Sequence, residues 1–252
     1  MNDAMSVEFD TLAEWTARVA VDLGPSYYIP AACRGSGSPA ALDWLIDALD
    51  LTDGESLLDC GAGVGGPAAY AQQQRSVRPV LVEPAAGACR AARTLFGSAA
   101  LQAAADALPV ADQSFDAAWS LGVLCTMDDQ LALLTELRRA VRPPGRIGLL
   151  VFVAGTAIAD SDQPDGNHFP TAASLEQLIT DAGLRIDRRH STADLPAIPD
   201  EWTRQTDAVT EALHRRYDRD PGWKVIEEQQ DRMSQLLGAG TISGSLLSLR
   251  VE

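Results

Sequence analysis

The sequence predicts an α/β fold built on a seven-stranded, mostly parallel sheet that helices cover on both faces. Seven short stretches fit strands, and stretches with apolar residues at helical spacing separate most of them. The strand stretches before residue 160 are apolar nearly throughout, which is typical of strands buried on both faces of a parallel sheet. The expected strands cover residues 56–59, 79–83, 99–103, 114–120, 146–153, 184–190 and 243–251.

Helices are predicted from the spacing of apolar residues and from their capping signals. Two helices precede the first strand, and helices follow strands one, two and four, the last with Asp128 and Asp129 as candidate caps. A capping box at 174–177 opens a further helix over 175–182. Residues 199–238 fit a pair of helices divided at 220–222. We therefore expect an N-terminal helical cap over 1–50 and one domain over 51–252, with a helical lid inserted at about 199–238.

Composition narrows the class of protein. The chain has 252 residues, of which 46% are hydrophobic and 22% charged, as in soluble globular proteins. The formal net charge of −15 argues against nucleic acid or an anionic membrane as a partner. The four cysteines are widely separated, and the longest apolar run, 147–159, is too short to span a bilayer. We expect a cytoplasmic protein that binds a small molecule; a homodimer is left open.

The stretch 56–67 reads as a strand, a glycine turn and the start of a helix. Gly61, Gly63 and Gly65 let the backbone turn sharply and leave no Cβ to hold a ligand away. A helix that begins there presents unpaired N–H groups to a ligand. Gly61-x-Gly63-x-x-Gly66, with Glu83 at the end of the next strand, fits a dinucleotide site. A tight strand-to-helix turn that binds no ligand is an alternative interpretation of the same residues.

Three acids stand at the ends of predicted strands or just after them. They are Asp59, Glu83 and Asp106. In an open parallel sheet the carboxyl ends of the strands meet at one edge, where ligands bind near the point at which strand order reverses. The three acids are therefore expected to share a site.

Several segments, in order, resemble the class I S-adenosylmethionine-dependent methyltransferases. Asp59-x-Gly61-x-Gly63-x-Gly65 is similar to motif I of that family, and Ala-Asp-Ala-Leu-Pro at 105–109, followed by Phe-Asp at 115–116, resembles a second conserved segment. The runs 137–146 and 169–184 resemble the approaches to strands five and six. The resemblance implies a Rossmann-like three-layer sandwich and S-adenosylmethionine as the cofactor.

The same resemblance implies roles for individual residues. Glu83 matches the acid that accepts both ribose hydroxyls, and Asp106 matches the one that meets the adenine amino group. The methyl donor has no phosphate, so Asp59 can attract its cationic end. A reductase is disfavoured because Lys224 is the only lysine and no tyrosine lies four residues before it. The implied cofactor-binding set is Asp59, Gly61, Gly63, Gly65, Glu83, Pro84, Asp106, Ala107 and Leu121.

The residues that contact the methyl acceptor are less well defined by the resemblance. Family members often carry two histidines after strand four, where this chain has Cys125 and Thr126. His168, expected on the carboxyl edge of the sheet, is the candidate general base, and Tyr28 is a rival or accessory. Candidate substrate contacts are Tyr27, Tyr28, His168, Trp202 and Trp223, the two tryptophans being otherwise ordinary core residues of the late helices.

No metal site is expected. Asp160, Asp162 and Asp165 form an acidic loop, but no histidine or cysteine cluster accompanies them. The predicted function is methyl transfer from S-adenosylmethionine to a small molecule, with a specialised metabolite as one candidate and with oxygen favoured over nitrogen or carbon as the acceptor atom. An NAD(P)-binding reductase and a non-catalytic, cofactor-binding member of the fold are the alternatives.

Overall fold

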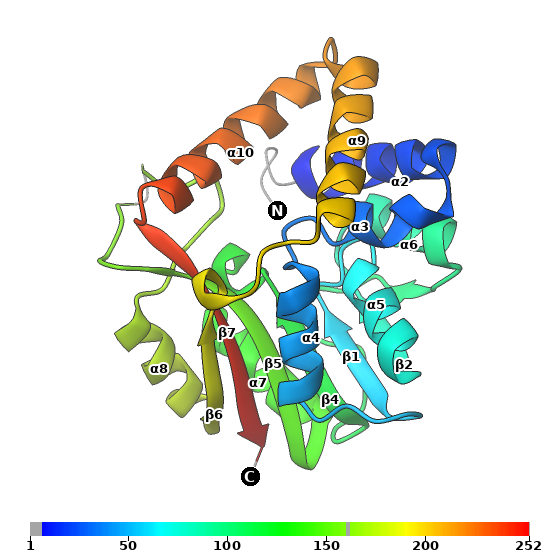
Figure 1. Cartoon of the computed structure of the whole chain (residues 1–252). Coiled ribbons are helices and arrows are strands. Elements are labelled where there is room, and N and C mark those ends of the chain that lie inside the picture. Colours follow the sequence, from blue (N-terminus) through cyan, green and yellow to red (C-terminus); the bar gives the residue numbers. More distant parts are fainter. Residues whose placement is uncertain (1–6, 160–161, 252) are drawn as a thin grey trace.

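The computed structural model describes residues 7–159 and 162–251, and Asp160 lies outside them. Seven strands form one sheet in the order β3-β2-β1-β4-β5-β7-β6, and only β7 runs antiparallel to its neighbours (Figure 1). The predicted Rossmann-like, mostly parallel sheet is confirmed. The strands are β1 (Ser56–Cys60), β2 (Arg78–Val82), β3 (Ala100–Leu101), β4 (Phe115–Leu121), β5 (Val141–Ala154), β6 (Leu184–Ser191) and β7 (Ile242–Val251).

Helices cover both faces of this sheet because each presents one apolar stripe to it. Leu42 and Leu45 pack on one face, and Leu134 and Leu137 pack on the other. The helices are α2 (Leu12–Leu23), α3 (Tyr28–Ala32), α4 (Pro39–Ala48), α5 (Gly66–Arg75), α6 (Ala86–Phe96), α7 (Gln130–Ala140), α8 (Ala172–Asp181), α9 (Asp200–Tyr217) and α10 (Pro221–Gly238). Strand order reverses between β1 and β4, so a ligand is expected at their carboxyl ends.

The N-terminal helices and the late helical pair share a core of their own. Trp15 of α2, Leu95 of α6, Leu213 of α9 and Ile226 of α10 belong to one buried cluster. A π-helical turn, η1 (Val7–Thr11), leads into α2 and packs against α6 and α10. In Figure 1, α10 runs from the tip of α9 back to the start of β7, across the end of the sheet to which β1 points. The boundaries of the predicted cap, domain and lid insertion stay a prediction.

The N-terminal caps of α8 and α7 differ in part from those predicted from the sequence. The capping box of α8 is Thr171 with Ser174, not Ser174 with Gln177: Thr171 Oγ1 accepts the Ser174 N–H at 3.2 Å, and Ser174 Oγ accepts the Thr171 N–H at 2.9 Å. Of the two predicted caps of α7, Asp129 accepts the Ala132 N–H, whereas Asp128 contacts His168. Within 7–159 and 162–251, no helix combines the length and apolarity needed to cross a membrane.

Candidate functional site

The glycine turn after β1 contains three left-handed residues with different surroundings. Gly61, Gly63 and Gly65 have φ values of +74°, +53° and +86°. A Cβ on Gly61 would collide with Val123, and one on Gly65 would lie 2.9 Å from Leu81 Cδ2. A Cβ on Gly63 would meet nothing within 4 Å. Packing therefore requires glycine at the first and third positions, and the second faces open space that a ligand can enter.

Glu83 ties this turn to the end of β2. Its Oε2 accepts the Gly63 N–H at 2.8 Å, its Oε1 accepts the Ala85 N–H at 2.9 Å, and the residue is 6% exposed. Burial raises the pKa of the Glu83 carboxyl, the two N–H groups lower it, and the charge of Asp10 raises it again. Each oxygen has a second lone pair, so the carboxylate can accept two further hydrogen bonds without losing its anchors.

Asp59 lies beside Glu83 and is almost fully buried. Burial raises its pKa to about 7; the nearby Trp119 indole opposes this shift and the charge of Glu83 adds to it. Asp59 Oδ2 and Trp119 Nε1 are both buried without a hydrogen-bond partner, so no bond of good geometry joins them. The pKa of this buried carboxyl group lies near neutral pH, so a nearby cation would stabilise its ionised form.

The other predicted cofactor residues lie on loops that leave the neighbouring strands. Pro84 follows β2 and is exposed, and its carbonyl accepts a hydrogen bond from Gln102 Nε2 at 3.2 Å. Asp106 and Ala107 are exposed in the turn between β3 and β4. Leu121 ends β4 and is buried. All nine predicted residues thus lie at or after the carboxyl ends of β1 to β4, and their contact with a cofactor stays a prediction.

Asp10 is a neighbour of this site that no sequence signal marks. Its Oδ1 accepts the Gly87 N–H at the start of α6, across 77 positions of sequence, and its charge acts on Glu83. Nothing in the pattern before α2 indicates that the segment returns to the second βα connection. A contact between such distant positions becomes visible only in the folded chain.

His168 lies in the loop between β5 and α8, against the connection that follows β4. Its Nε2 is 2.9 Å from Asp128 Oδ1, its N–H donates to the Cys125 carbonyl at 2.6 Å, and its own carbonyl accepts from Gln130 Nε2 at 2.6 Å. The imidazole is 43% exposed and the Asp128 side chain 99% exposed. The backbone hydrogen bonds to Cys125 and Gln130 thus fix the predicted base on the carboxyl edge, and its side chain contacts an exposed aspartate.

The aromatic candidates divide between two clusters. Trp223 is 4% exposed in the core shared by cap and lid, where its ring lies edge-on to His214 at 5.8 Å. Tyr27 and Tyr28 border the same core, and the Tyr28 ring meets Phe96 at 6.3 Å. Trp202 packs against Tyr70 on α5. These contacts account for the packing of all four side chains, and their contact with a substrate stays a prediction.

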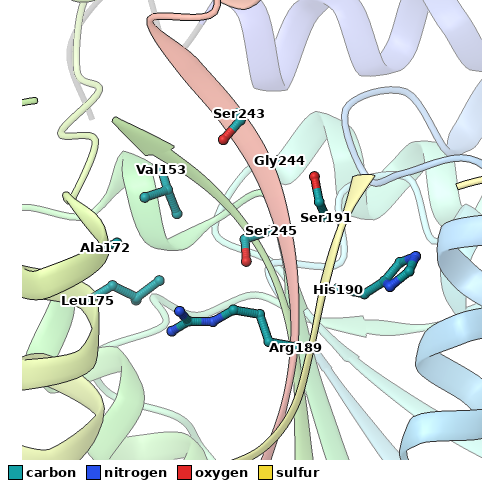
Figure 2. Close-up of a pocket in the computed structure, with 9 residues that line it drawn as sticks. All are labelled: Val153, Ala172, Leu175, Arg189, His190, Ser191, Ser243, Gly244 and Ser245. Atoms are coloured by element: carbon teal, nitrogen blue, oxygen red, sulfur yellow. The ribbon is translucent and has the colours of Figure 1, made fainter. Parts of the chain in front are cut away.

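A hollow of about 200 Å³ lies away from the glycine turn, between α8 and the strands β5, β7 and β6. Figure 2 shows its lining, with Arg189 and His190 pointing to opposite sides of β6. Arg189 pairs with Glu176 at 2.9 Å, and His190 stacks on Trp44 at 5.8 Å. The hollow contains none of the predicted site residues. In the described part of the chain, no group of three or more His, Cys, Asp or Glu side chains is arranged to hold a metal ion.

Comparison with known proteins agrees with this geometry. Residues 58–149 match the family model of the methyltransferase domain. That segment contains the glycine turn, Glu83, Asp106 and the strands β2 to β4 complete. Over these residues the chain is similar to the class I S-adenosylmethionine-dependent methyltransferases.

Individual curated relatives match the chain over part of their length. The chain is 32% identical over 158 residues to "Methyltransferase GfsG" of Streptomyces halstedii, covering 56% of this chain and 57% of that protein. It is 31% identical over 152 residues to "O-methyltransferase resE" of Aspergillus sclerotiorum, covering 55% and 58%. The matches thus span a little over half of these relatives. Among solved structures, the [4+2]-cyclase SpnF superposes with a TM-score of 0.71 at 20% identity, covering 97% of this chain and 95% of that one, which shows the shared fold.

Proposed function

We propose that the protein transfers a methyl group from S-adenosylmethionine to a small-molecule acceptor. The observation that carries this proposal is the buried Glu83 carboxylate, which Gly63 and Ala85 anchor while leaving acceptor capacity on both oxygens. A ribose offers two adjacent hydroxyls that suit such a carboxylate. The match of residues 58–149 to the methyltransferase-domain model supports the same cofactor.

The surrounding residues fit the other parts of this cofactor. Gly63 leaves open space at the turn, and Asp59 Oδ2 is a buried acceptor without a partner. A molecule whose methionine end carries ammonium and sulfonium charges provides the cation that this carboxyl favours, whereas a pyrophosphate would be repelled. When bound, S-adenosylmethionine supplies an electrophilic methyl group. The chain's part is to bind and orient it, and orientation can provide about 7–11 kcal/mol of a reaction barrier.

For the acceptor we propose an oxygen atom, in line with the relative named as an O-methyltransferase. An alcohol or phenol loses a proton during transfer, and His168 is the proposed base, with Asp128 2.9 Å from its Nε2. Tyr28 is the accessory candidate. Full turnover of a His168→Ala variant on an accepted substrate would remove His168 from this role.

Binding of S-adenosylhomocysteine by titration calorimetry tests the cofactor directly, with NADH as the competing probe. We expect the wild-type protein to bind S-adenosylhomocysteine and not NADH. Glu83→Gln should weaken this binding roughly tenfold to a hundredfold, because hydrogen bonds to charged groups contribute about 1.5–3 kcal/mol each. Asp116→Asn is the matched control, since that carboxylate also accepts a backbone N–H, from Ser56 at the far end of β1. Binding of NADH alone, or unchanged affinity in Glu83→Gln, contradicts the proposal.

A further inference from the structure

The N-terminal segment caps α6 from a distance. The residue before α6, Ala85, has no side chain that can cap the helix. Asp10 Oδ1 instead accepts the Gly87 N–H in the first helical turn. The fit is close, because a Cβ on Gly87 would run into the backbone carbonyl of Asp10. A segment far away in sequence thus supplies the hydrogen-bond acceptor that usually precedes a helix.

The start of α6 is also the edge of the proposed ribose site. Ala85 donates its N–H to Glu83 Oε1, two residues before Gly87. The backbone from Glu83 to Gly87 is therefore fixed at one end by the carboxylate that faces the cofactor and at the other by Asp10. If the hydrogen bond between Asp10 and Gly87 is lost, the backbone at Ala85 is less well fixed, and so is the Glu83 carboxylate that Ala85 binds.

The segment around Asp10 is part of the contact between cap and lid. Arg90 of α6 pairs with Glu14 of α2 at 2.6 Å, and the Trp15 ring stacks on that of Tyr217 at 4.2 Å. The turn η1 also packs against α10. Figure 1 shows α2 lying across α6 and beside α9. Asp10 therefore stands where cap, lid and the second βα connection meet.

We propose that Asp10 is a positioning residue for the cofactor: by capping α6 it holds Glu83 in place and slows cofactor release. This inference rests on the proposed function, because it concerns the same site. Asp10 acts through Gly87 and Ala85 and needs no contact with the cofactor. The acceptor atom is what the cap requires, so an asparagine at this position can replace the aspartate.

Stopped-flow and calorimetric measurement of S-adenosylhomocysteine binding test the proposal. Asp10→Ala should weaken binding about fivefold or more, with faster dissociation, because the cap is lost. Asp10→Asn keeps an oxygen acceptor and should bind within about twofold of wild type. Gly87→Ala leaves Asp10 intact but displaces it, and should behave like Asp10→Ala. Asp22→Ala is the control: it removes an ion pair of α2 with Arg216 of the lid at 2.7 Å, away from α6, and should leave release unchanged.

Failure of the positioning role can be distinguished from failure of the proposed function. If wild-type protein does not bind S-adenosylhomocysteine, the proposed function fails. If wild type binds but Asp10→Ala and Gly87→Ala release the ligand at the wild-type rate, the positioning role fails, whatever happens to thermal stability. An Asp10→Asn variant as weak as Asp10→Ala also overturns it, because the cap would not explain the loss. Should Asp10→Ala not fold, Gly87→Ala and Asp10→Asn still decide the matter.

Discussion

Asp59 is the residue whose chemistry depends most on burial. In solution an aspartate ionises near pH 3.8, and here burial raises the pKa to about 7. Between these values the folded state holds a proton that the unfolded state has lost. Stability of the ligand-free protein is therefore highest below pH 3.8 as far as this group is concerned, and this contribution is lost as the pH rises towards 7. At one pKa unit per 1.36 kcal/mol, the loss is at most roughly 4 kcal/mol.

Replacing the carboxyl by an amide removes this pH dependence. We expect Asp59→Asn to be more stable than wild type without ligand, by a margin that grows from pH 5 to pH 8. Denaturant unfolding monitored by circular dichroism at several pH values measures this margin. The same variant should bind S-adenosylmethionine more weakly at pH 8, because the anion that attracts the cationic end is gone. A constant margin across this pH range would show that Asp59 does not titrate with the raised pKa.

At the scale of the element, the turn between β1 and α5 combines two demands on one short stretch. Its glycines adopt left-handed angles, which cost other residues roughly 1–2 kcal/mol each. Only some of them also lack room for a side chain. Gly61 faces Val123 at close range, whereas Gly63 faces open space. The two positions therefore separate what the fold needs from what a ligand needs.

Alanine at these two positions should give opposite results. Gly61→Ala should reduce the free energy of unfolding by more than the left-handed strain alone, because overpacking typically adds about 1–3 kcal/mol. Gly63→Ala should cost only the strain, yet lose most of the affinity for S-adenosylhomocysteine, because its methyl group enters the ligand's space. Denaturant titration and calorimetry on both variants provide the comparison. Wild-type affinity in Gly63→Ala would show that the turn does not approach the cofactor.

For the molecule as a whole, the lid formed by α9 and α10 is attached at both ends. Near its tip, Tyr217 stacks on Trp15 of the cap. Further along, Gln229 Oε1 accepts the Asp165 N–H at 2.9 Å, which connects α10 to the loop that carries His168. Separation of α9 and α10 from the rest of the molecule would therefore disturb both the N-terminal helices and the loop of the proposed base. The attachment at the tip can be probed by itself, because Lys224, the only lysine, lies exposed in α10.

Cleavage by a lysine-specific protease reports opening at that single site. Tyr217→Ala should be cut severalfold faster than wild type, because stacked aromatic pairs contribute about 0.5–1.5 kcal/mol beyond their buried area. Tyr217→Phe is the matched control: it keeps the stack and removes a hydroxyl that is buried without a partner, so cleavage should be no faster than in wild type. Equal cleavage of the alanine and phenylalanine variants would mean that the stack does not hold the lid.

The sequence by itself determined the sheet, most of the helices and the sheet edge at which the proposed cofactor site lies. Strands buried on both faces are recognised as continuous apolar runs, and a glycine turn between strand and helix is recognised from a few consecutive residues. Because parallel strands end at one edge, Asp59, Glu83 and Asp106 could be assigned to a common edge before any contact was known. These features depend on neighbours in the chain.

Only the tertiary structure decided which distant side chains support that edge. Asp10 reaches Gly87, Asp128 reaches His168 rather than serving as a cap, and Trp223 packs into a core shared by cap and lid. No local pattern encodes such pairs, because each partner taken alone resembles an ordinary surface acid, loop histidine or core tryptophan. The packing of the N-terminal helices and the lid brings these partners together, so their contacts exist only in the folded chain.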